Sequence, residues 1–240
     1  MAITAFPPIA QADEHGLLAL GGDLEVPSLL LAYIQGIFPW PIDPEMPMAW
    51  FSPDPRGIVD FRKIHFARSF IKAWKKTPFR VTFNQDFAQV ITSCAHVHSS
   101  HGMKSTWITD EIIDCYTALY EAGHAFSVET WLGEELVGGL YGVSLGNYVS
   151  GESMFYLKPH ASKVAIAVLA VTLLQKNVTW LDTQMITTVT KAMGGEYIPR
   201  KEFLKNLQSS IDRVSLISIF VRENITPIYP SFLGPQNQNQ

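Results

Sequence analysis

The sequence predicts an α+β protein with a mixed sheet, on three observations. Three stretches in the middle of the chain alternate like strands, and turns containing glycine separate them, which indicates an antiparallel meander. An apolar helical stretch and a short strand follow, in the order of a parallel crossover unit. The first 60 residues are instead rich in proline, glycine and aromatic residues. We therefore expect a small N-terminal domain over 1–60, packed on a larger domain over 61–240.

The N-terminal domain is expected to contain little regular structure. A short helix is predicted from Pro27 to Gln35, because Pro27 falls in its first turn and Gly36 follows its end. The stretch from Phe38 to Pro55 holds six prolines, which predicts extended and irregular backbone. Its aromatic residues could line one side of a cleft, or form a plain hydrophobic clasp on the next domain.

The spacing of apolar residues predicts the elements of the larger domain. Helices are predicted near 67–76, 84–95 and 109–122, and strands near 124–131, 136–143 and 147–155. An apolar helix over about 161–176 then precedes a strand that ends near Asp182. Shorter helices are predicted near 187–193 and 200–208, and the last residues are expected to fray.

Composition limits the classes of protein to consider. The chain is 47% hydrophobic and 17% charged, which is a globular balance. Cys94 and Cys115 form no CxxC pair, so neither a disulfide framework nor a zinc site is indicated. The N-terminus lacks the pattern of a signal peptide, and the apolar run from Val164 to Leu174 is shorter than the roughly 20 residues of a membrane span. We therefore expect a soluble cytoplasmic protein without a bound metal.

Basic residues are concentrated in one segment, although the net charge is -4. The stretch from Arg62 to Arg80 holds seven of them and no acidic residue. Four share one face of the predicted helix by their spacing: Arg68, Lys72, Lys75 and Lys76. This face could neutralise phosphates of a nucleic acid. A solvated charged face without a ligand explains the run at least as well.

Two carboxylates fall near the ends of neighbouring strands in the crossover unit. Alternation places Tyr148, Ser150, Glu152 and Met154 on one face of the first strand, and Trp180, Asp182 and Gln184 on one face of the second. Ligands of α/β sheets gather at the carboxyl ends of such strands. These residues are therefore candidates for a site, although each carboxylate could instead cap a loop or pair with a lysine.

Eight ordered segments of the chain resemble leucyl/phenylalanyl-tRNA–protein transferases. They are GLLALGGDL from Gly16, GIFPW from Gly36, SPDPR from Ser52, WIT from Trp107, LVGGLYGV from Leu136, GESMF from Gly151, ASK from Ala161 and DTQ from Asp182. Together they cover nearly the whole chain in the family's order and spacing. The resemblance implies a small N-terminal domain on a C-terminal domain similar to GCN5-related N-acetyltransferases.

The resemblance also implies a reaction and its partners. Leucine or phenylalanine, and less readily methionine, would move from aminoacyl-tRNA to the α-amine of a protein with N-terminal Arg or Lys. The product would be marked for N-end rule degradation. An α-amine has a pKa near 7.7–8.0, so a carboxylate that accepts its proton would assist the attack. No cofactor is implied, and we expect a monomer.

The family's site residues are carried over by position. Asp182 is the implied proton acceptor, with Gln184 as its relay, although Asp182 could instead hold the cationic side chain of the acceptor. Glu152 is expected to orient the aminoacyl ester or the tRNA terminus. The implied aminoacyl pocket consists of Met154, Leu140 and Leu169, in which unbranched Met suits both leucine and phenylalanine. Ordinary core packing is the alternative for these three residues.

The tRNA would be held at its end and along its acceptor stem. Trp50 and Trp107 match aromatic positions that contact the 3′-adenosine, and stacking of a base contributes about 1–3 kcal/mol. The basic face of Arg68, Lys72, Lys75 and Lys76 would hold the stem through phosphate contacts.

Several positions depart from the family pattern. Phe51 stands where many members have a second Trp, and Pro41 replaces an aromatic residue. Phe126 occupies a position that is often His, and Val189 and Ala192 stand in place of His and Ser. The missing histidines favour Asp182 as the base.

Three other functions compete with the transferase. A GCN5-type acyl-CoA N-acyltransferase needs a glycine-containing pyrophosphate loop, but the loop here reads YLKPHASK, and Pro159 removes an amide. A non-catalytic tRNA-binding module would use the basic helix but leaves Asp182, Gln184 and Glu152 unexplained. Nothing in the sequence favours or excludes a scaffold with a hydrophobic cleft.

Overall fold

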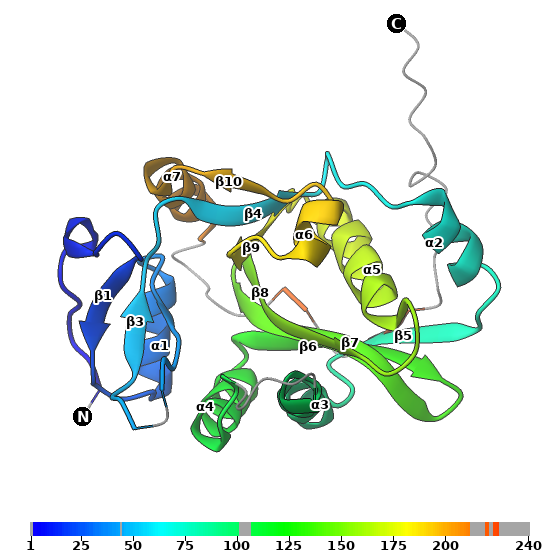
Figure 1. Cartoon of the computed structure of the whole chain (residues 1–240), viewed down its shortest axis with the longest axis horizontal. Helices are drawn as coiled ribbons and strands as arrows, with labels where there is room; N and C mark the ends of the chain where they lie inside the picture. Colours follow the sequence, from blue (N-terminus) through cyan, green and yellow to red (C-terminus); the bar gives the residue numbers. More distant parts are fainter. Residues whose placement is uncertain (1, 44, 101–106, 212–218, 221–222, 226–240) are drawn as a thin grey trace, which may run out of the picture.

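The computed structural model describes residues 2–43, 45–100, 107–211, 219–220 and 223–225, and it contains two sheets (Figure 1). The small sheet has the order β1-β3-β2, and it is built from β1 (Leu17–Leu20), β2 (Phe38–Pro39) and β3 (Ala49–Phe51). The short 3₁₀ helix η1 (Ile9–Gln11) precedes this sheet, and α1 (Val26–Tyr33) lies between β1 and β2 in the chain. The predicted N-terminal helix is therefore confirmed, with an earlier end.

The large sheet has eight strands in the order β10-β4-β9-β8-β7-β6-β5-β11. Its strands are β4 (Arg56–Asp60), β5 (Phe79–Phe83), β6 (Ala125–Leu132), β7 (Glu135–Leu145), β8 (Tyr148–Tyr156), β9 (Trp180–Gln184), β10 (Glu196–Ile198) and β11 (Glu223–Ile225). Strands β6, β7 and β8 form the predicted antiparallel meander, and β9 runs parallel to β8 after the crossover helix. The predicted α+β class with a mixed sheet is confirmed.

Helices cover both faces of the large sheet. They are α2 (Arg68–Trp74), α3 (Phe87–Ser100), α4 (Asp110–Glu121), α5 (Ala161–Gln175), α6 (Thr188–Ala192) and α7 (Arg200–Ser210). Figure 1 shows α5 on one face and α3 and α4 on the other. One apolar cluster joins α2 and α5 to the sheet, and the other joins the sheet to α1, α3, α4 and α7. Helix α5 is buried nearly all round, which explains its continuous apolar sequence.

Close contact between α5 and β7 depends on a glycine. A Cβ atom on Gly138 would lie 2.5 Å from the Cβ of Ala161, the first residue of α5. The glycine therefore lets the helix start directly against the sheet.

The structure also contains strands that sequence spacing did not predict. The stretch from Phe38 to Pro55, expected to be irregular, contains β2 and β3. β4 pairs with β9, so residues 56–60 belong to the large sheet although they fall within the expected N-terminal domain. The basic helix α2 ends at Trp74, so Lys75 and Lys76 lie beyond its last residue. The final residues expected to fray lie outside the described part.

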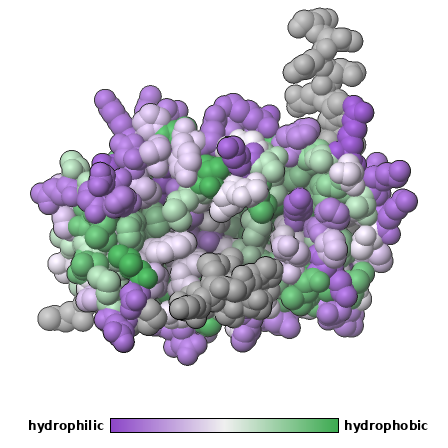
Figure 2. All heavy atoms as spheres, in the orientation of Figure 1, coloured by the Kyte–Doolittle hydropathy of each residue, from purple (hydrophilic) through white to green (hydrophobic). Residues whose placement is uncertain are grey.

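The described surface is mixed in character. Figure 2 shows apolar side chains gathered over the part that holds the small sheet, where Leu20, Ile42 and Met46 are exposed. Within the described ranges, none of the helices combines the length and the apolar character that crossing a membrane requires.

Candidate active site

The site lies where β8 and β9 part. The two parallel strands are in register at Ser150 and Asp182. Two residues later β9 ends at Gln184, whose φ of 54° is left-handed and turns the chain away from β8. Glu152 and Gln184 therefore face each other at the opening between the strands.

A β-bulge in β8 determines which way Glu152 and Met154 point. Gly151 pairs with Gly142 and Ser153 with Tyr141, so Glu152 is the extra residue between them. As a result Tyr148 packs in the cluster of α1 and α4, whereas Met154 packs against the cluster of α5. The prediction that alternation puts Tyr148, Ser150, Glu152 and Met154 on one face is therefore wrong for Met154, because the bulge shifts the alternation by one residue after Glu152.

Asp182 is fully buried, and its carboxylate receives four hydrogen bonds. Oδ1 accepts from Arg56 Nε at 2.9 Å and from the backbone N–H of Gln184 at 2.9 Å. Oδ2 accepts from Arg56 Nη2 at 2.7 Å and from the hydroxyl of Tyr148 at 2.6 Å. An ionised carboxylate has about four lone-pair positions, so Asp182 has none left for a substrate proton.

Arg56 was not predicted as a site residue, although it ends the SPDPR segment. Its guanidinium lies between the rings of Phe38, 4.7 Å from the centroid, and Phe203, at 4.4 Å. Its Nη1 donates to the backbone carbonyl of Gly36 at 3.0 Å. The small sheet, α7 and β9 thus meet at one buried side chain, and no local sequence signal reveals such a meeting.

Glu152 is only partly buried, in contrast to Asp182. Its Oε1 accepts from the hydroxyl of Ser150 at 2.6 Å and from Gln184 Nε2 at 3.0 Å. The hydroxyl of Tyr116 donates to Oε2 at 3.4 Å and lies 2.5 Å from the hydroxyl of Tyr33. Desolvation raises the pKa of Glu152 to about 7, and the hydrogen bond from Ser150 acts in the opposite direction. Glu152 can therefore exchange a proton near neutral pH.

The three predicted pocket residues lie together on the α5 side of the sheet. Leu140 of β7 pairs with Met154 of β8, and Leu169 of α5 belongs to the same apolar cluster. Leu140 and Leu169 are fully buried, whereas Met154 is partly exposed. Met154 is thus the one of the three that a ligand can reach without displacing core residues.

Of the two predicted tryptophans, only Trp107 is placed to meet a base. Trp50 is fully buried, its Nε1 donates to the carbonyl of Gly21 at 2.8 Å, and Phe6 packs edge-on at 4.9 Å. Trp107 instead stacks on Trp40, with ring centroids 4.6 Å apart and planes 14° apart. Both rings of this pair are only partly buried. Sequence reasoning missed Trp40, although it lies in the GIFPW segment.

The four predicted tRNA-binding residues lie on the surface, whereas Phe126, which departs from the family pattern, lies in the core. The side chains of Arg68, Lys72, Lys75 and Lys76 are all exposed. Phe126 is fully buried and stacks on Phe220 at 4.2 Å, so its ring fills the core. Within the described ranges, no three His, Cys, Asp or Glu side chains are grouped as ligands for a metal ion.

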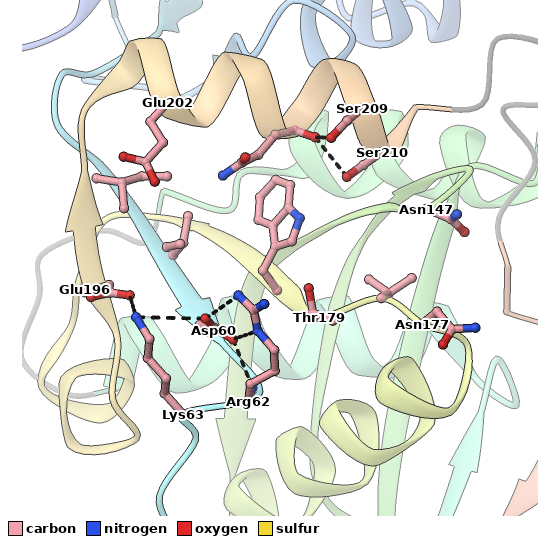
Figure 3. A pocket seen from close by; sticks show the side chains of 15 residues that line it. Asp60, Arg62, Lys63, Asn147, Asn177, Thr179, Glu196, Glu202, Ser209 and Ser210 are labelled. Atoms are coloured by element: carbon pink, nitrogen blue, oxygen red, sulfur yellow. Dashed lines mark hydrogen bonds and ion pairs between the residues drawn. The ribbon is translucent and has the colours of Figure 1, made fainter.

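A polar hollow of about 470 Å³ lies elsewhere, between α7 and the strands β4, β9 and β10 (Figure 3). Four of its charged side chains are paired: Arg62 donates to Asp60 through Nη2 at 2.7 Å, and Lys63 donates to Glu196 at 2.7 Å. Trp180 separates this hollow from Tyr148 and Asp182. Of the candidates that strand alternation or the family resemblance gave, only Trp180 lines it.

Solved structures that resemble the chain share little sequence with it. An aminoglycoside acetyltransferase from an uncultured soil metagenomic sample gives a TM-score of 0.35 at 13% identity, over 60% of this chain and 95% of that one. The L-PGS structure from Bacillus licheniformis gives 0.37 at 14% identity, over 67% and 50%. These likenesses are too weak to support an argument about function.

Sequence relatives are much closer. A leucyl/phenylalanyl-tRNA–protein transferase of Flavobacterium johnsoniae is 43% identical over 85% of this chain and 95% of its own length. The Pseudoalteromonas atlantica protein of that name is 43% identical over 92% and 94%, and one from Anaeromyxobacter is 44% identical over 88% and 90%.

Family models match both parts of the molecule. The model of the leucyl/phenylalanyl-tRNA protein transferase N-terminal domain matches residues 22–54, which include α1, β2 and β3. The model of leucyl/phenylalanyl-tRNA protein transferase matches residues 58–208, which carry Glu152, Asp182 and Gln184. On these matches and relatives, the chain belongs to the leucyl/phenylalanyl-tRNA protein transferase family.

Proposed function

We propose that this enzyme transfers leucine or phenylalanine, and less readily methionine, from aminoacyl-tRNA to the α-amine of proteins with N-terminal Arg or Lys. The transfer would mark these proteins for N-end rule degradation. Family membership supports the reaction class, since the relatives are named for leucyl- and phenylalanyl-tRNA. The observation that carries the mechanism is the contrast between Asp182, whose oxygens are all occupied, and Glu152, which is partly exposed.

This contrast supports exchanging the roles that the sequence predicted for Asp182 and Glu152. The four donors on Asp182 suit a carboxylate that holds other groups in place, and they leave no room for a cationic side chain of the acceptor. Glu152 has a pKa of about 7, which suits a general base at neutral pH. We therefore assign proton acceptance to Glu152 and its positioning to Gln184.

The proposed transfer begins at the acceptor amine. The α-amine nitrogen attacks the ester carbonyl carbon, and its surplus proton passes to Glu152. The bond from this carbon to the ribose oxygen then breaks, and the leaving oxygen takes up the proton from Glu152, which becomes a carboxylate again. The products are a new peptide bond and a tRNA with a free hydroxyl. The ester is already activated, so the proposed reaction uses no cofactor and no metal, and positioning supplies much of the rate.

We assign the contacts with the substrates to side chains that are exposed or partly exposed. The Trp40–Trp107 pair takes the place of the predicted Trp50 at the 3′-adenosine, because its rings are partly exposed. Met154 borders the aminoacyl side chain, backed by Leu140 and Leu169. Exposed Arg68, Lys72, Lys75 and Lys76 hold the acceptor stem. We further propose a cytoplasmic monomer of two domains, in which residues 56–60 belong to the second domain, because β4 is part of the large sheet.

An acyl-CoA N-acyltransferase is less well supported. The segment before α5 runs through Pro159, which has no amide hydrogen, and through His160 with a φ of 73°. A pyrophosphate bound there would lose one of the backbone donors that a helix N-terminus offers. Binding of CoA to the purified protein would revive this alternative.

The direct test uses radiolabelled Leu-tRNA and Phe-tRNA with two peptides that differ only in their first residue, Arg or Gly. Label on the Arg peptide alone is the expected result. Label on neither peptide, with the tRNA still bound, would refute the transferase and favour a tRNA-binding module. Label on both peptides would keep the transferase and refute the acceptor preference.

We expect the transfer rate at limiting aminoacyl-tRNA to fall steeply with salt, because each neutralised phosphate releases counterions. Replacing Lys72 and Lys75 by Gln should reduce the slope of log(kcat/KM) against log[salt] by about 0.7–0.9 for each phosphate that is no longer neutralised. The matched control replaces Lys201 and Lys205, two exposed lysines of α7, by Gln. Equal slopes in both variants would argue against binding of the stem by α2.

We expect Met154→Ala to change the preference between leucine and phenylalanine. The substitution enlarges the space beside the aminoacyl group, so kcat/KM for Phe-tRNA should rise relative to Leu-tRNA by about 10-fold, the effect of a modest change in an apolar pocket. Leu136→Ala, in the other apolar cluster, is the control. An unchanged ratio in Met154→Ala would place this side chain in the core alone.

A further inference from the structure

The guanidinium of Arg56 is held from three sides. It is 1% exposed and lies in a bidentate ion pair with Asp182. The backbone carbonyl of Gly36 accepts a hydrogen bond from its Nη1, and two phenylalanine rings cover its faces. A buried ion pair is costly to form, so its presence next to Gln184 and Glu152 calls for a reason beyond stability.

We propose that Arg56 is a positioning residue for the transfer, which acts on Glu152 through Asp182 and Gln184. The inference rests on the proposed function, in which Glu152 accepts the proton of the attacking amine. Arg56 would act in two ways: it fixes the geometry of the turn that holds Glu152, and it balances the charge of Asp182.

The geometric part follows a chain of contacts. Arg56 fixes both oxygens of Asp182, and Oδ1 of Asp182 also accepts the backbone N–H of Gln184 at 2.9 Å. Gln184 has a left-handed φ of 54°, which is unfavourable for a non-glycine residue and persists only where neighbours hold it. From this turn its Nε2 donates to Glu152 at 3.0 Å. A loosened Asp182 would therefore release the amide that orients Glu152.

The electrostatic part follows from the groups that face Glu152. They are Asp182 on β9, Arg56 on β4, Tyr33 on α1, Tyr116 on α4, Tyr141 on β7 and Tyr148 on β8. Burial raises the pKa of all four tyrosines, so they stay neutral. The charge of Asp182 raises the pKa of Glu152, and that of Arg56 lowers it. Arg56 thus keeps Glu152 ionisable beside a second buried carboxylate.

The test follows the titration of Glu152 in the intact protein by the 13C chemical shift of its labelled carboxyl group. Glu152→Gln identifies the signal. Arg56→Met should move the titration to higher pH by about one unit, because the charge of Asp182 is no longer balanced. Asp182→Asn should move it to lower pH, and the double variant should return it towards the wild-type value.

Arg56→Lys separates geometry from charge. It keeps the positive charge but loses the bidentate fork, so the titration should stay in place while kcat falls about tenfold, with KM for aminoacyl-tRNA unchanged. The control is Arg62→Met, which removes an exposed guanidinium that makes a fork of the same geometry on Asp60, away from Glu152. It should change neither the titration nor kcat.

The role of Arg56 and the transferase activity are tested by different measurements. An unmoved titration in folded Arg56→Met, or an equal shift in Arg62→Met, would overturn the role of Arg56. If Arg56→Met fails to fold, the other two variants decide. A shift of the Glu152 titration to lower pH in Asp182→Asn that is reversed in the double variant supports the role of Arg56, and the lack of such a shift refutes that role. Lack of transfer by the wild-type enzyme would refute the proposed function, while the titration still decides whether Arg56 acts on Glu152.

Discussion

Replacing Glu152 by Gln is expected to lower kcat about 10²–10⁴-fold, because general base catalysis contributes about this much. Gln keeps the size of the side chain and can still bond to Ser150 and Gln184, which contact Oε1 in the native protein. It cannot accept a proton from the attacking amine. The measurement is single-turnover transfer to an Arg peptide, with aminoacyl-tRNA saturating.

The pH dependence of the same variant gives a sharper test. Below pH 7, both the acceptor amine and Glu152 become protonated, so log(kcat/KM) of the wild-type enzyme should rise with a slope near 2. In Glu152→Gln only the amine titrates, and the slope should fall to about 1. A slope of 2 retained in the variant would assign the second proton to another group.

Glu152→Gln should lower the transfer rate without lowering the free energy of unfolding at pH 8. The pKa of Glu152 is raised in the folded state, so folding favours its protonated form. This contribution is fully present below the unfolded pKa of 4.5 and is lost as the pH rises through about 7. At pH 8 the Gln variant should therefore be at least as stable as the wild type by denaturant unfolding. Glu129→Gln is the control: the pKa of this buried carboxyl is also raised by desolvation, but the residue lies with Ser127 and Thr82, so the substitution should leave the pH slope of transfer unchanged.

The meander and the crossover unit could be predicted because their signals are local. Apolar alternation, the turns at Gly133 and Gly146, and the continuous apolar run of α5 each occupy a short stretch of sequence. β4 has no such signal: all five of its residues are buried and mix polar with apolar types. Its partner β9 lies more than 100 residues further along the chain, so only the folded sheet reveals the strand.

The site residues could be predicted better than their roles. The resemblance located Glu152, Asp182 and Gln184, and the structure brings all three together. It could not show that Arg56 and Tyr148 occupy Asp182, because these donors come from distant strands. The bulge at Glu152 had one weak signal, the isolated Gly151 within a strand, which often marks a bulge.

Asp182→Ala should unfold much of the site rather than only remove a chemical group. The substitution leaves the buried guanidinium of Arg56 without its counter-charge, and breaking a buried pair from one side costs about 3–5 kcal/mol. It also leaves the Tyr148 hydroxyl and the backbone N–H of Gln184 without their acceptor. We expect a large drop in the free energy of unfolding, measured in urea, together with loss of transfer.

Asp60→Ala is the matched control, because Asp60 receives a fork from Arg62 at 2.9 and 2.7 Å, as Asp182 does from Arg56. The side chain of Arg62 is 67% exposed, so water solvates it once its partner is gone. Loss of the ion pair with this exposed guanidinium should cost only about 0–1 kcal/mol. If the two variants lose equal amounts of unfolding free energy, burial does not determine how much the Arg56–Asp182 ion pair contributes to stability. If Asp182→Ala keeps full stability and loses transfer alone, Asp182 takes part in the chemistry, and proton acceptance returns from Glu152 to Asp182.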